Sequence, residues 1–458
     1  MKGKRVMVLG MARSGIACAK LLLLRGAEVT VCDLKAEAAF DGALDVLKDA
    51  GAHLLLGEKH PEEHLAGMDA LIISPGIPDT HPAVCAARGM GIEVMGEVEY
   101  AYRESTGTLL AITGTNGKTT TTTLLGEIFK NAGKRTFVVG NIGTPYSGAV
   151  PEMRPGDVTV CEISSFQMET SQSFHPSICA VLNISEDHLN RHGTMEKYVA
   201  LKERIFENCG PGDWLILNWD DPVTRGMAAR AKCQVSWFSS RNEVPWGAFV
   251  KDGMIVHGTP ESHKPICAAS EVYIPGEHNL QNALAAAAMA MAADIPAPVI
   301  RQTLRTFKGV EHRIEFVREL DGIRFINDSK GTNVDSTIQA LRAMDRPTVI
   351  ILGGSPKKTD YRPLGEEMKK TPIVHAVLIG ETAGEIRSAL DEVGYTDYTL
   401  AGYDFEKAIG LCCRLVPDNG NVLLSPACAS FDMFDDYEAR GRIFKGIVNK
   451  LERAREAD

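Results

Sequence analysis

A glycine-rich turn followed by lysine and threonine is the part of this chain best suited to phosphate chemistry. Residues 113–120 read TGTNGKTT and follow an apolar run at 109–112 that predicts a strand. Backbone N–H groups in such a turn, at the start of a helix, cradle phosphate oxygens. The amine of Lys118 can then reach the terminal phosphates, and the hydroxyl of Thr119 can hold Mg²⁺. A turn that only caps a helix is the alternative, but the order of these features favours ATP or GTP binding.

The predicted phosphate loop is shorter than usual. The common form has a glycine six residues before its lysine, whereas position 112 is isoleucine, so the pattern here is G-x-x-G-K-T. The residues expected to surround the phosphates are Gly114, Thr115, Asn116, Gly117, Lys118, Thr119 and Thr120.

Two more strands are predicted to end beside this loop. Residues 158–161 run into Glu162, and residues 178–184 run into a polar segment that ends at His188. Because ligands gather at the carboxyl ends of parallel strands, we expect Glu162 and His188 to share a rim with Lys118. Mg²⁺ favours a few carboxylates plus substrate phosphates, so this rim suits that ion. The alternatives are a solvent-facing cap for Glu162 and a structural role for His188.

Composition describes an ordinary globular chain. Its 458 residues suggest about three domains at ~150 residues each. The net charge of −10 and the pI near 5.7 argue against a nucleic-acid-binding surface. The eleven cysteines form no C-x-x-C pair, which favours a reducing cytosol over a disulfide framework or a zinc site.

Neither 1–26 nor 283–293 has the apolar core of a signal peptide or a membrane span, so we expect a cytoplasmic protein without membrane insertion.

The first ~105 residues alternate apolar strands with helices, which indicates a parallel sheet covered on both faces. The segment after the first strand is Gly10-Met-Ala-Arg-Ser-Gly15, a variant of the dinucleotide-binding turn with Ala12 at its middle glycine position. Asp33 ends the second strand, where an acid that contacts ribose or a base is expected. NAD, a uridine or adenine nucleotide, and a purely structural turn all remain open.

The last part of the chain repeats this alternation of strands and helices. Its apolar runs end in polar or small residues at 327–333, 353–357, 380 and 425–432, which predicts a further binding rim. We expect domains at residues 1–105, 106–310 and 311–458. Before the last boundary, Asn279 or Asn282 could act as the N-cap of an alanine-rich helix.

Several motifs together resemble the Mur ligase family, whose members build the peptide stem of bacterial peptidoglycan. They are Gly114-Thr-Asn-Gly-Lys-Thr, Glu162-Ile-Ser-Ser-Phe-Gln, Asn183-Ile-Ser-Glu-Asp-His188, Gly276-Glu-His-Asn279, His312-Arg313 and Asn327-Asp-Ser-Lys330. The resemblance implies an α/β protein of three domains: a Rossmann-like N-terminal domain, a central P-loop ATPase-type domain with a parallel sheet, and a Rossmann-like C-terminal domain. The segment at 425–432 is similar to that of members that add D-glutamate to UDP-N-acetylmuramoyl-L-alanine. We therefore expect an ATP-dependent ligase that acts on these small molecules as a monomer.

The resemblance also implies roles for the catalytic and metal-binding residues. Lys118 and Thr119 would hold phosphate and one Mg²⁺, with Glu162 on the metal. His188 and a carbamylated Lys202 would hold a second Mg²⁺. Without the resemblance, Lys202 is expected to be an exposed helical lysine.

Binding residues follow from the same resemblance. The further ATP contacts would be Asn279, Arg313, Asp328 and Lys330. The UDP-bearing substrate would meet Met11, Ala12, Asp33, Leu34, Lys35, Ser74 and Gly76, with Asn141 at its muramoyl-alanine arm. D-Glutamate would meet Thr332, Lys357, Ser430, Phe431 and Tyr437.

Some positions depart from the family pattern. Phe431 and Tyr437 stand where Leu and Phe are familiar, Ser355-Pro356 replaces Asp-Gly, and Lys35 replaces Arg. The alternatives are another Mur ligase, a folylpolyglutamate synthase, an NAD-dependent dehydrogenase that uses the turn after the first strand, and a non-catalytic nucleotide-sensing or nucleic-acid-binding protein.

Overall fold

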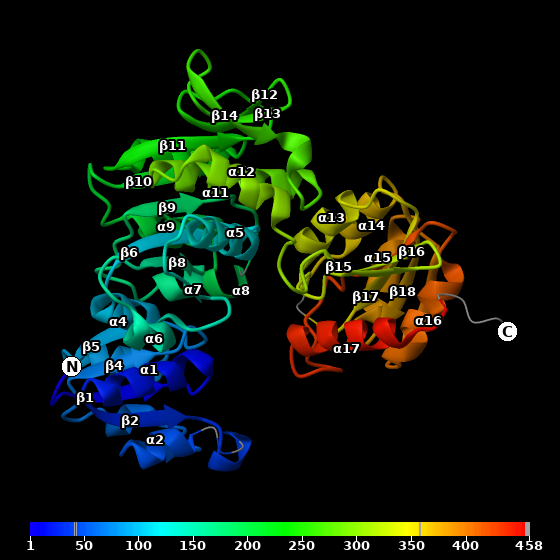
Figure 1. The fold of residues 1–458 in the computed structure, drawn as a ribbon. Coiled ribbons are helices and arrows are strands. Elements are labelled where there is room, and N and C mark those ends of the chain that lie inside the picture. Colours follow the sequence, from blue (N-terminus) through cyan, green and yellow to red (C-terminus); the bar gives the residue numbers. More distant parts are fainter. Residues whose placement is uncertain (41, 43, 188, 357–358, 454–458) are drawn as a thin grey trace. The chain divides into compact units, whose positions relative to one another are not determined.

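The chain folds into two compact units. The computed structural model describes residues 1–40, 42, 44–187, 189–356 and 359–453. The first unit holds residues 1–273 and 279–307, and the second holds residues 274–278 and the chain from Lys308 onward. Two β-sheets belong to the first unit and one to the second (Figure 1).

The N-terminal sheet has five parallel strands in the order β3-β2-β1-β4-β5. The strands are β1 (Arg5–Leu9), β2 (Glu28–Asp33), β3 (His53–Leu56), β4 (Ala70–Ile73) and β5 (Glu93–Gly96). Helices α1 (Arg13–Leu24), α2 (Asp45–Asp49), α3 (Pro82–Gly89) and α4 (Glu97–Glu104) connect or follow them. Parallel order brings the ends of β1, β2 and β4 to one edge, which is the edge expected to bind a nucleotide.

The central sheet has nine strands in the order β14-β13-β12-β11-β10-β9-β6-β8-β7. They are β6 (Thr108–Thr113), β7 (Thr136–Gly140), β8 (Val158–Glu162), β9 (Ile178–Val181), β10 (Trp214–Asn218), β11 (Gln234–Ser239), β12 (Gly247–Lys251), β13 (Met254–Gly258) and β14 (His263–Ala268). The strands from β7 to β12 pair in parallel, whereas β12, β13 and β14 pair antiparallel. Sequence reasoning did not predict this antiparallel edge.

A two-residue turn explains the change of direction. Asp252 and Gly253 join β12 to β13 with φ of 49° and 75°. Positive φ at both central residues is the hairpin turn that Asp-Gly favours. The sequence therefore carried a signal for this hairpin.

Helices of the central domain surround its sheet. They are α5 (Lys118–Asn131), α6 (Tyr146–Ala149), α7 (Ser165–Met168), α8 (Leu189–His192), α9 (Met195–Glu203), α10 (Pro222–Met227), α11 (Glu277–Ala292) and α12 (Ala297–Thr306). Because α11 begins at Glu277, Asn279 and Asn282 lie inside it, and the expectation that one of them is its N-cap is wrong. Among the helices described, none is long and apolar enough to cross a membrane.

The C-terminal sheet has six strands in the order β15-β16-β20-β17-β18-β19. They are β15 (Glu315–Leu320), β16 (Ile323–Asn327), β17 (Thr348–Gly353), β18 (Ile373–Ile379), β19 (Tyr398–Gly402) and β20 (Asn421–Leu424). β15 pairs antiparallel with β16, and the other described strand pairs of this sheet are parallel. The accompanying helices are α13 (Val334–Arg342), α14 (Arg362–Met368), α15 (Ala383–Glu392), α16 (Phe405–Leu415) and α17 (Tyr437–Lys450). Three mostly parallel sheets confirm the α/β prediction, while the domain boundaries after residues 105 and 310 stay predictions.

Candidate functional site

The phosphate loop connects β6 to α5 through two glycines in the left-handed region. Gly114 has φ of 147° and Gly117 has φ of 83°. A Cβ at Gly117 would collide with the Oδ1 of Asn282, so this position requires glycine for space as well as for conformation. Lys118 begins α5 and curls back across the loop, where its Nζ donates to the carbonyl oxygens of Gly114 at 2.9 Å and Thr115 at 2.8 Å.

The segment after β9 holds this loop in shape. The N–H of Asn116 donates to Oδ1 of Asn183 at 2.8 Å, and Nδ2 of Asn183 donates to the carbonyl of Asn116 at 3.1 Å. The hydroxyl of Thr115 lies 3.1 Å from that of Tyr198 and accepts the N–H of Ser185 at 3.0 Å. The loop is therefore fixed before any ligand binds. Thr119 and Thr120 lie in the first turn of α5 beside it.

Glu162 lies at the end of β8, directly beside β6, where it pairs in register with Ile112. Only 1% of Glu162 is exposed, so the solvent-facing alternative is wrong. Its Oε1 accepts a hydrogen bond from Nδ2 of Asn141 at 3.0 Å. Its Oε2 is buried without a hydrogen-bond partner among the described residues. A buried carboxylate oxygen of this kind is costly unless a cation or donor meets it.

Lys202 is 2% exposed, which overturns the expectation of an exposed helical lysine. Its Nζ donates to the carbonyl of Gly114 at 2.7 Å and lies 4.7 Å from the ring centre of Tyr198. Burial, with a further contribution from the charge of Lys118, holds the pKa of Lys202 well below its usual range. The structure thus brings Lys118 and Lys202 to the same loop and places Glu162 on the strand next to it. His188 lies outside the described residues.

The N-terminal sheet collects the residues expected to bind the UDP group. The carboxylate of Asp33 accepts the N–H of Met11 at 2.6 Å and that of Lys35 at 2.9 Å. The hydroxyl of Ser74 donates to the carbonyl of Gly10 at 2.6 Å. Asp33 ends β2, and the segments that follow β1, β2 and β4 carry the other residues of this set: Met11, Ala12, Leu34, Lys35, Ser74 and Gly76.

The turn after β1 keeps one feature of the dinucleotide fingerprint. Helix α1 begins after Ala12 without a side-chain cap, which leaves a helix N-terminus suited to phosphate. A Cβ at Gly15 would collide with the carbonyl of Gly10, so the last glycine is required for the helix to pack against the strand.

A salt-bridged arginine joins this edge to the central domain, and sequence reasoning missed it. Arg191 donates to the carbonyl oxygens of Pro75 and Ile77, each at 3.0 Å, and pairs with the carboxylate of Glu169 at 2.6 Å. Its guanidinium also lies 4.3 Å from the ring centre of Phe166. No sequence signal marks an arginine that binds another domain's carbonyl oxygens, because arginines are usually exposed.

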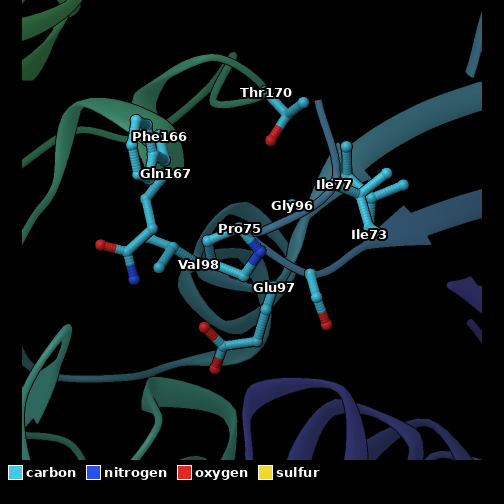
Figure 2. Close-up of a pocket in the computed structure, with 10 residues that line it drawn as sticks. Ile73, Pro75, Ile77, Gly96, Glu97, Val98, Phe166, Gln167 and Thr170 are labelled. Carbon is cyan, nitrogen blue, oxygen red and sulfur yellow. The ribbon is translucent and has the colours of Figure 1, made fainter. Parts of the chain in front are cut away.

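A small cavity lies at the same seam (Figure 2). Its volume of about 10 Å³ suits about one water molecule. Residues of both domains line it, among them Pro75, Glu97, Phe166, Gln167 and Thr170. It also touches Ser74, so the expected UDP edge and the segment after Glu162 meet here.

In the second unit, the predicted ATP contacts meet at the end of β16. Asp328 is fully buried and accepts a 2.6 Å hydrogen bond from the hydroxyl of Ser425. Nη1 of Arg313 lies 3.7 Å from its Oδ1. Burial raises the pKa of Asp328, although the charge of Arg313 opposes this shift. The N–H of Lys330 donates to the carbonyl of His312 at 3.0 Å. Asn279 belongs to the first unit.

Among the described residues expected to bind D-glutamate, Thr332, Ser430 and Phe431 lie on loops of the second unit. Ser430 is buried, whereas Phe431 is 75% exposed. Tyr437 begins α17, and its carbonyl accepts the hydroxyl of Ser329 at 2.7 Å. Thr332 follows the Asp328 segment. Lys357 lies outside the described residues.

Two further side chains tie these loops together, and neither was predicted as such. The hydroxyl of Ser355 accepts the N–H of Asp432 at 2.7 Å and donates to its carboxylate at 3.2 Å. Arg440, 1% exposed, donates to Ser329 and to the carbonyl oxygens of Cys428 and Ala429. Burial lowers the pKa of Arg440 to about 10. These contacts fix the loops that end β16, β17 and β20.

Family models match all three parts of the chain. They describe a Mur ligase MurD-like N-terminal domain at residues 4–96, a Mur ligase middle domain at 112–290 and a Mur ligase glutamate ligase domain at 312–428.

Curated relatives are similar along the whole chain. UDP-N-acetylmuramoylalanine–D-glutamate ligase of Caldanaerobacter subterraneus subsp. tengcongensis is 46% identical over 99% of this chain and 100% of its own length. The enzyme of the same name from Pelotomaculum thermopropionicum is 46% identical over 98% of each chain. That of Clostridioides difficile is 41% identical over 98% of this chain and 99% of its own.

Solved structures share the fold at lower identity. UDP-N-acetylmuramate-alanine ligase MurC from Thermotoga maritima has a TM-score of 0.60 at 18% identity and covers 97% of this chain and 99% of its own. MurF ligase from the same organism, in complex with ADP, has a TM-score of 0.58 at 17% identity, with 86% and 93% covered. The three family matches and the relatives above 40% identity all indicate a Mur ligase along the length of the chain. The protein therefore belongs to the Mur ligase family of ATP-dependent, amide-bond-forming enzymes.

Proposed function

We propose that this protein joins D-glutamate to UDP-N-acetylmuramoyl-L-alanine in the cytoplasmic synthesis of peptidoglycan precursors. The observation that carries the proposal is the 46% identity, over 99% of the chain, to a ligase named for that reaction. The phosphate loop, the buried Glu162 and the buried Lys202 support it, because they supply the groups that phosphate transfer requires.

The reaction begins at a carboxylate, which is a poor acyl donor. The terminal carboxylate of the UDP-bearing substrate attacks the γ-phosphorus of ATP, and ADP leaves. The resulting acyl phosphate has a good leaving group, so the amine of D-glutamate attacks the acyl carbon and phosphate departs. Lys118 and the loop N–H groups bind the β- and γ-phosphates and offset their charge during transfer.

The residues present fit bound Mg²⁺. The buried Oε2 of Glu162, which has no hydrogen-bond partner among the described residues, is a suitable oxygen ligand for this ion. Mg²⁺, when bound, supplies charge neutralisation at the transferring phosphate. We assign two ions to Thr119, Glu162, His188 and Lys202.

Lys202 would serve as a ligand only after carbamylation. Its lowered pKa favours the neutral amine, whose nitrogen can attack CO₂ and release one proton to give a carbamate. The carbamate carries a negative charge and two oxygen ligands in place of the neutral amine. It therefore suits a site that already holds Lys118.

The remaining assignments follow the domains, for which we propose the boundaries 1–105, 106–310 and 311–458. The first domain binds UDP through the residues after β1, β2 and β4, and Asn141 of the central domain positions the muramoyl-alanine arm. ATP is held by the phosphate loop with Asn279, Arg313, Asp328 and Lys330. D-Glutamate is held by Thr332, Lys357, Ser430, Phe431 and Tyr437. We propose that the enzyme acts as a monomer, with no nucleic-acid partner.

An isotope experiment tests the proposed reaction. UDP-N-acetylmuramoyl-L-alanine labelled with ¹⁸O in its terminal carboxylate is incubated with ATP, Mg²⁺ and D-glutamate. We expect one ¹⁸O atom in each phosphate released, because the bridging oxygen of the acyl phosphate leaves with phosphorus. Phosphate without label, as measured by mass spectrometry, would show attack by water and contradict the proposal.

A further inference from the structure

Three residues with different metal-binding atoms meet at the edge of the central sheet opposite the phosphate loop. His175 lies just before β9, Asp213 directly before β10, and Cys209 shortly after a 3₁₀ turn at Arg204–Phe206. The starts of β9 and β10 are adjacent, because Ile178 pairs in register with Trp214. The topology therefore gathers side chains that are far apart in sequence.

The three ligand atoms are close to one another. Nε2 of His175 lies 2.7 Å from Oδ2 of Asp213, and these atoms and Sγ of Cys209 all lie within 4.8 Å of each other. Cys209 is 2% exposed, Asp213 is partly buried and His175 is exposed. The cluster is thus anchored in the interior and open to solvent on one side.

Further thiols adjoin Cys209. Sγ of Cys179, on β9, lies 4.0 Å from Sγ of Cys209. The thiol of Cys233, which directly precedes β11, also interacts with Cys209. Cys209 therefore adjoins two other thiols as well as an imidazole and a carboxylate. None of these cysteines forms a C-x-x-C pair, so the sequence did not indicate a metal site here.

The donor set has a specific chemical preference. Imidazole nitrogen, thiolate sulfur and carboxylate oxygen are the ligands of tetrahedral zinc sites, at about 2.0–2.3 Å from the ion. Those bond lengths place ligand atoms ~3.5 Å apart, so closing the cluster requires a shift of about 1 Å. The segment between Cys209 and Asp213 is Gly-Pro-Gly, and the exposed His175 side chain can rotate.

We propose that His175, Cys209 and Asp213 bind a thiophilic divalent cation of the zinc class, at a site separate from the ATP site. Three protein ligands leave the fourth position to water on the exposed side. On binding, the Cys209 thiol releases its proton to solvent and the sulfur bonds to the cation. The Nε2 proton of His175, which is shared with Asp213, is also displaced, and the neutral ring binds the cation through Nε2 with its proton on Nδ1, so the cation replaces the hydrogen bond between His175 and Asp213.

The consequence is a cross-link at the base of the central sheet. The cation would join the segments that precede β9 and β10 to the segment that follows the 3₁₀ turn. These three segments are otherwise held together by hydrogen bonds and packing. A ligand that binds only the folded state raises the unfolding temperature. We therefore expect the cation to stabilise the first unit without being required for ligation.

Cobalt titration of the full-length protein tests the site. Co²⁺ is added in the presence of a non-thiol reductant and saturating Mg²⁺, and the absorption spectrum is recorded. We expect one equivalent of tetrahedral Co²⁺ with a thiolate-to-cobalt charge-transfer band. The ATP site cannot produce this band, because its assigned ligands contain no sulfur.

Variants separate this site from other thiols. Cys209→Ser should abolish the charge-transfer band. His175→Ala changes an exposed residue, so the protein should fold, and the apparent affinity for Co²⁺ should fall at least about tenfold. Cys85→Ser removes an exposed thiol of α3 and should leave the titration unchanged. The proposal is overturned if no thiolate band appears, or if the band and affinity persist in both Cys209→Ser and His175→Ala.

Discussion

Two lysines share one carbonyl oxygen at the phosphate loop. The carbonyl of Gly114 accepts Nζ of Lys118 at 2.9 Å and Nζ of Lys202 at 2.7 Å. Two ammonium groups this close in a buried site repel each other strongly. Burial and the charge of Lys118 both lower the pKa of Lys202, which favours the neutral form of Lys202 and relieves that repulsion. We therefore expect Lys202 to be the neutral or carbamylated member of the pair.

Carbamylation predicts a dependence on CO₂. In CO₂-depleted buffer, kcat should fall and should recover when bicarbonate is added. Lys202→Ala should lower kcat by about 100-fold or more, with partial rescue by formate or acetate, which can replace the missing carboxylate. Lys197→Ala, an exposed lysine of the same helix, is the matched control. Full activity of Lys202→Ala, or a wild-type kcat that does not change with CO₂ concentration, would rule out this role.

Sequence alone predicted that the glycine-rich turn and Glu162 lie at neighbouring strand ends, because strands, glycines and polar ends come in a recognisable order. The burial of Lys202 could not be predicted in this way, since its helix has no clear apolar stripe and only the family resemblance pointed to it. Arg191 and Arg440 were missed for a related reason. Their partners are backbone carbonyl oxygens, and the sequence does not indicate which carbonyl oxygens face a given side chain.

At the scale of elements, charged side chains hold the seam between the N-terminal and central domains. The carboxylate of Glu99, on α4, accepts the backbone N–H groups of Gln172, Ser173 and Phe174. Arg191 holds the segment after β4 in a similar way from the central domain. Apolar residues of both domains also form one continuous core. The edge proposed to bind UDP is therefore positioned by the domain that carries the phosphate loop.

Arg191→Lys tests this positioning. Lysine keeps the charge but loses the planar set of donors that reaches the carbonyl oxygens of residues 75–77, so the segment should loosen. We expect the KM for the UDP-bearing substrate to rise about tenfold, equivalent to about 1.4 kcal/mol, while the KM for D-glutamate is unchanged. Arg225→Lys, at an arginine that donates to Trp219, serves as control. An equal rise in both KM values in steady-state kinetics would point to general loosening instead.

Glu97 gives the seam a pH dependence. It is buried at the start of α4, where its carboxylate accepts the N–H of Ser147 at 2.6 Å, and burial raises the pKa of Glu97. The Glu97 carboxyl therefore binds its proton more tightly in the folded state than in the unfolded chain. The contribution of Glu97 to stability is full below the unfolded pKa of about 4.3 and declines as pH rises through the folded value.

Glu97→Gln removes that decline and keeps an acceptor for Ser147. Relative to wild type, the free energy of unfolding of the variant should increase from pH 5 to pH 8 in urea titrations. Glu127→Gln, at a partly exposed residue of α5, should show the same free energy of unfolding as wild type at both pH values. A Glu97→Gln difference that is constant or decreases with pH would contradict the assigned shift.

At the scale of the whole molecule, the three sheets of the chain share one arrangement of strands and loops. Each sheet collects polar loops at the carboxyl ends of its parallel strands, as open α/β sheets do when they bind ligands. Continuous apolar runs made this architecture predictable. The β12–β14 edge was not anticipated, because its hairpin signal is confined to two turn residues. The cluster at His175, Cys209 and Asp213 was not predictable either, since it depends on which strands become neighbours.

The most direct test of the central claim is phosphate release from ATP and Mg²⁺ with UDP-N-acetylmuramoyl-L-alanine. D-Glutamate, L-alanine, L-lysine and diaminopimelate are offered separately. We predict release with D-glutamate only, which would support the D-glutamate assignment despite Phe431 and Tyr437. If no phosphate is released with D-glutamate, or if phosphate is released with another amine, the substrate assignment is contradicted. The loops of the C-terminal domain would then have to bind a different amino acid.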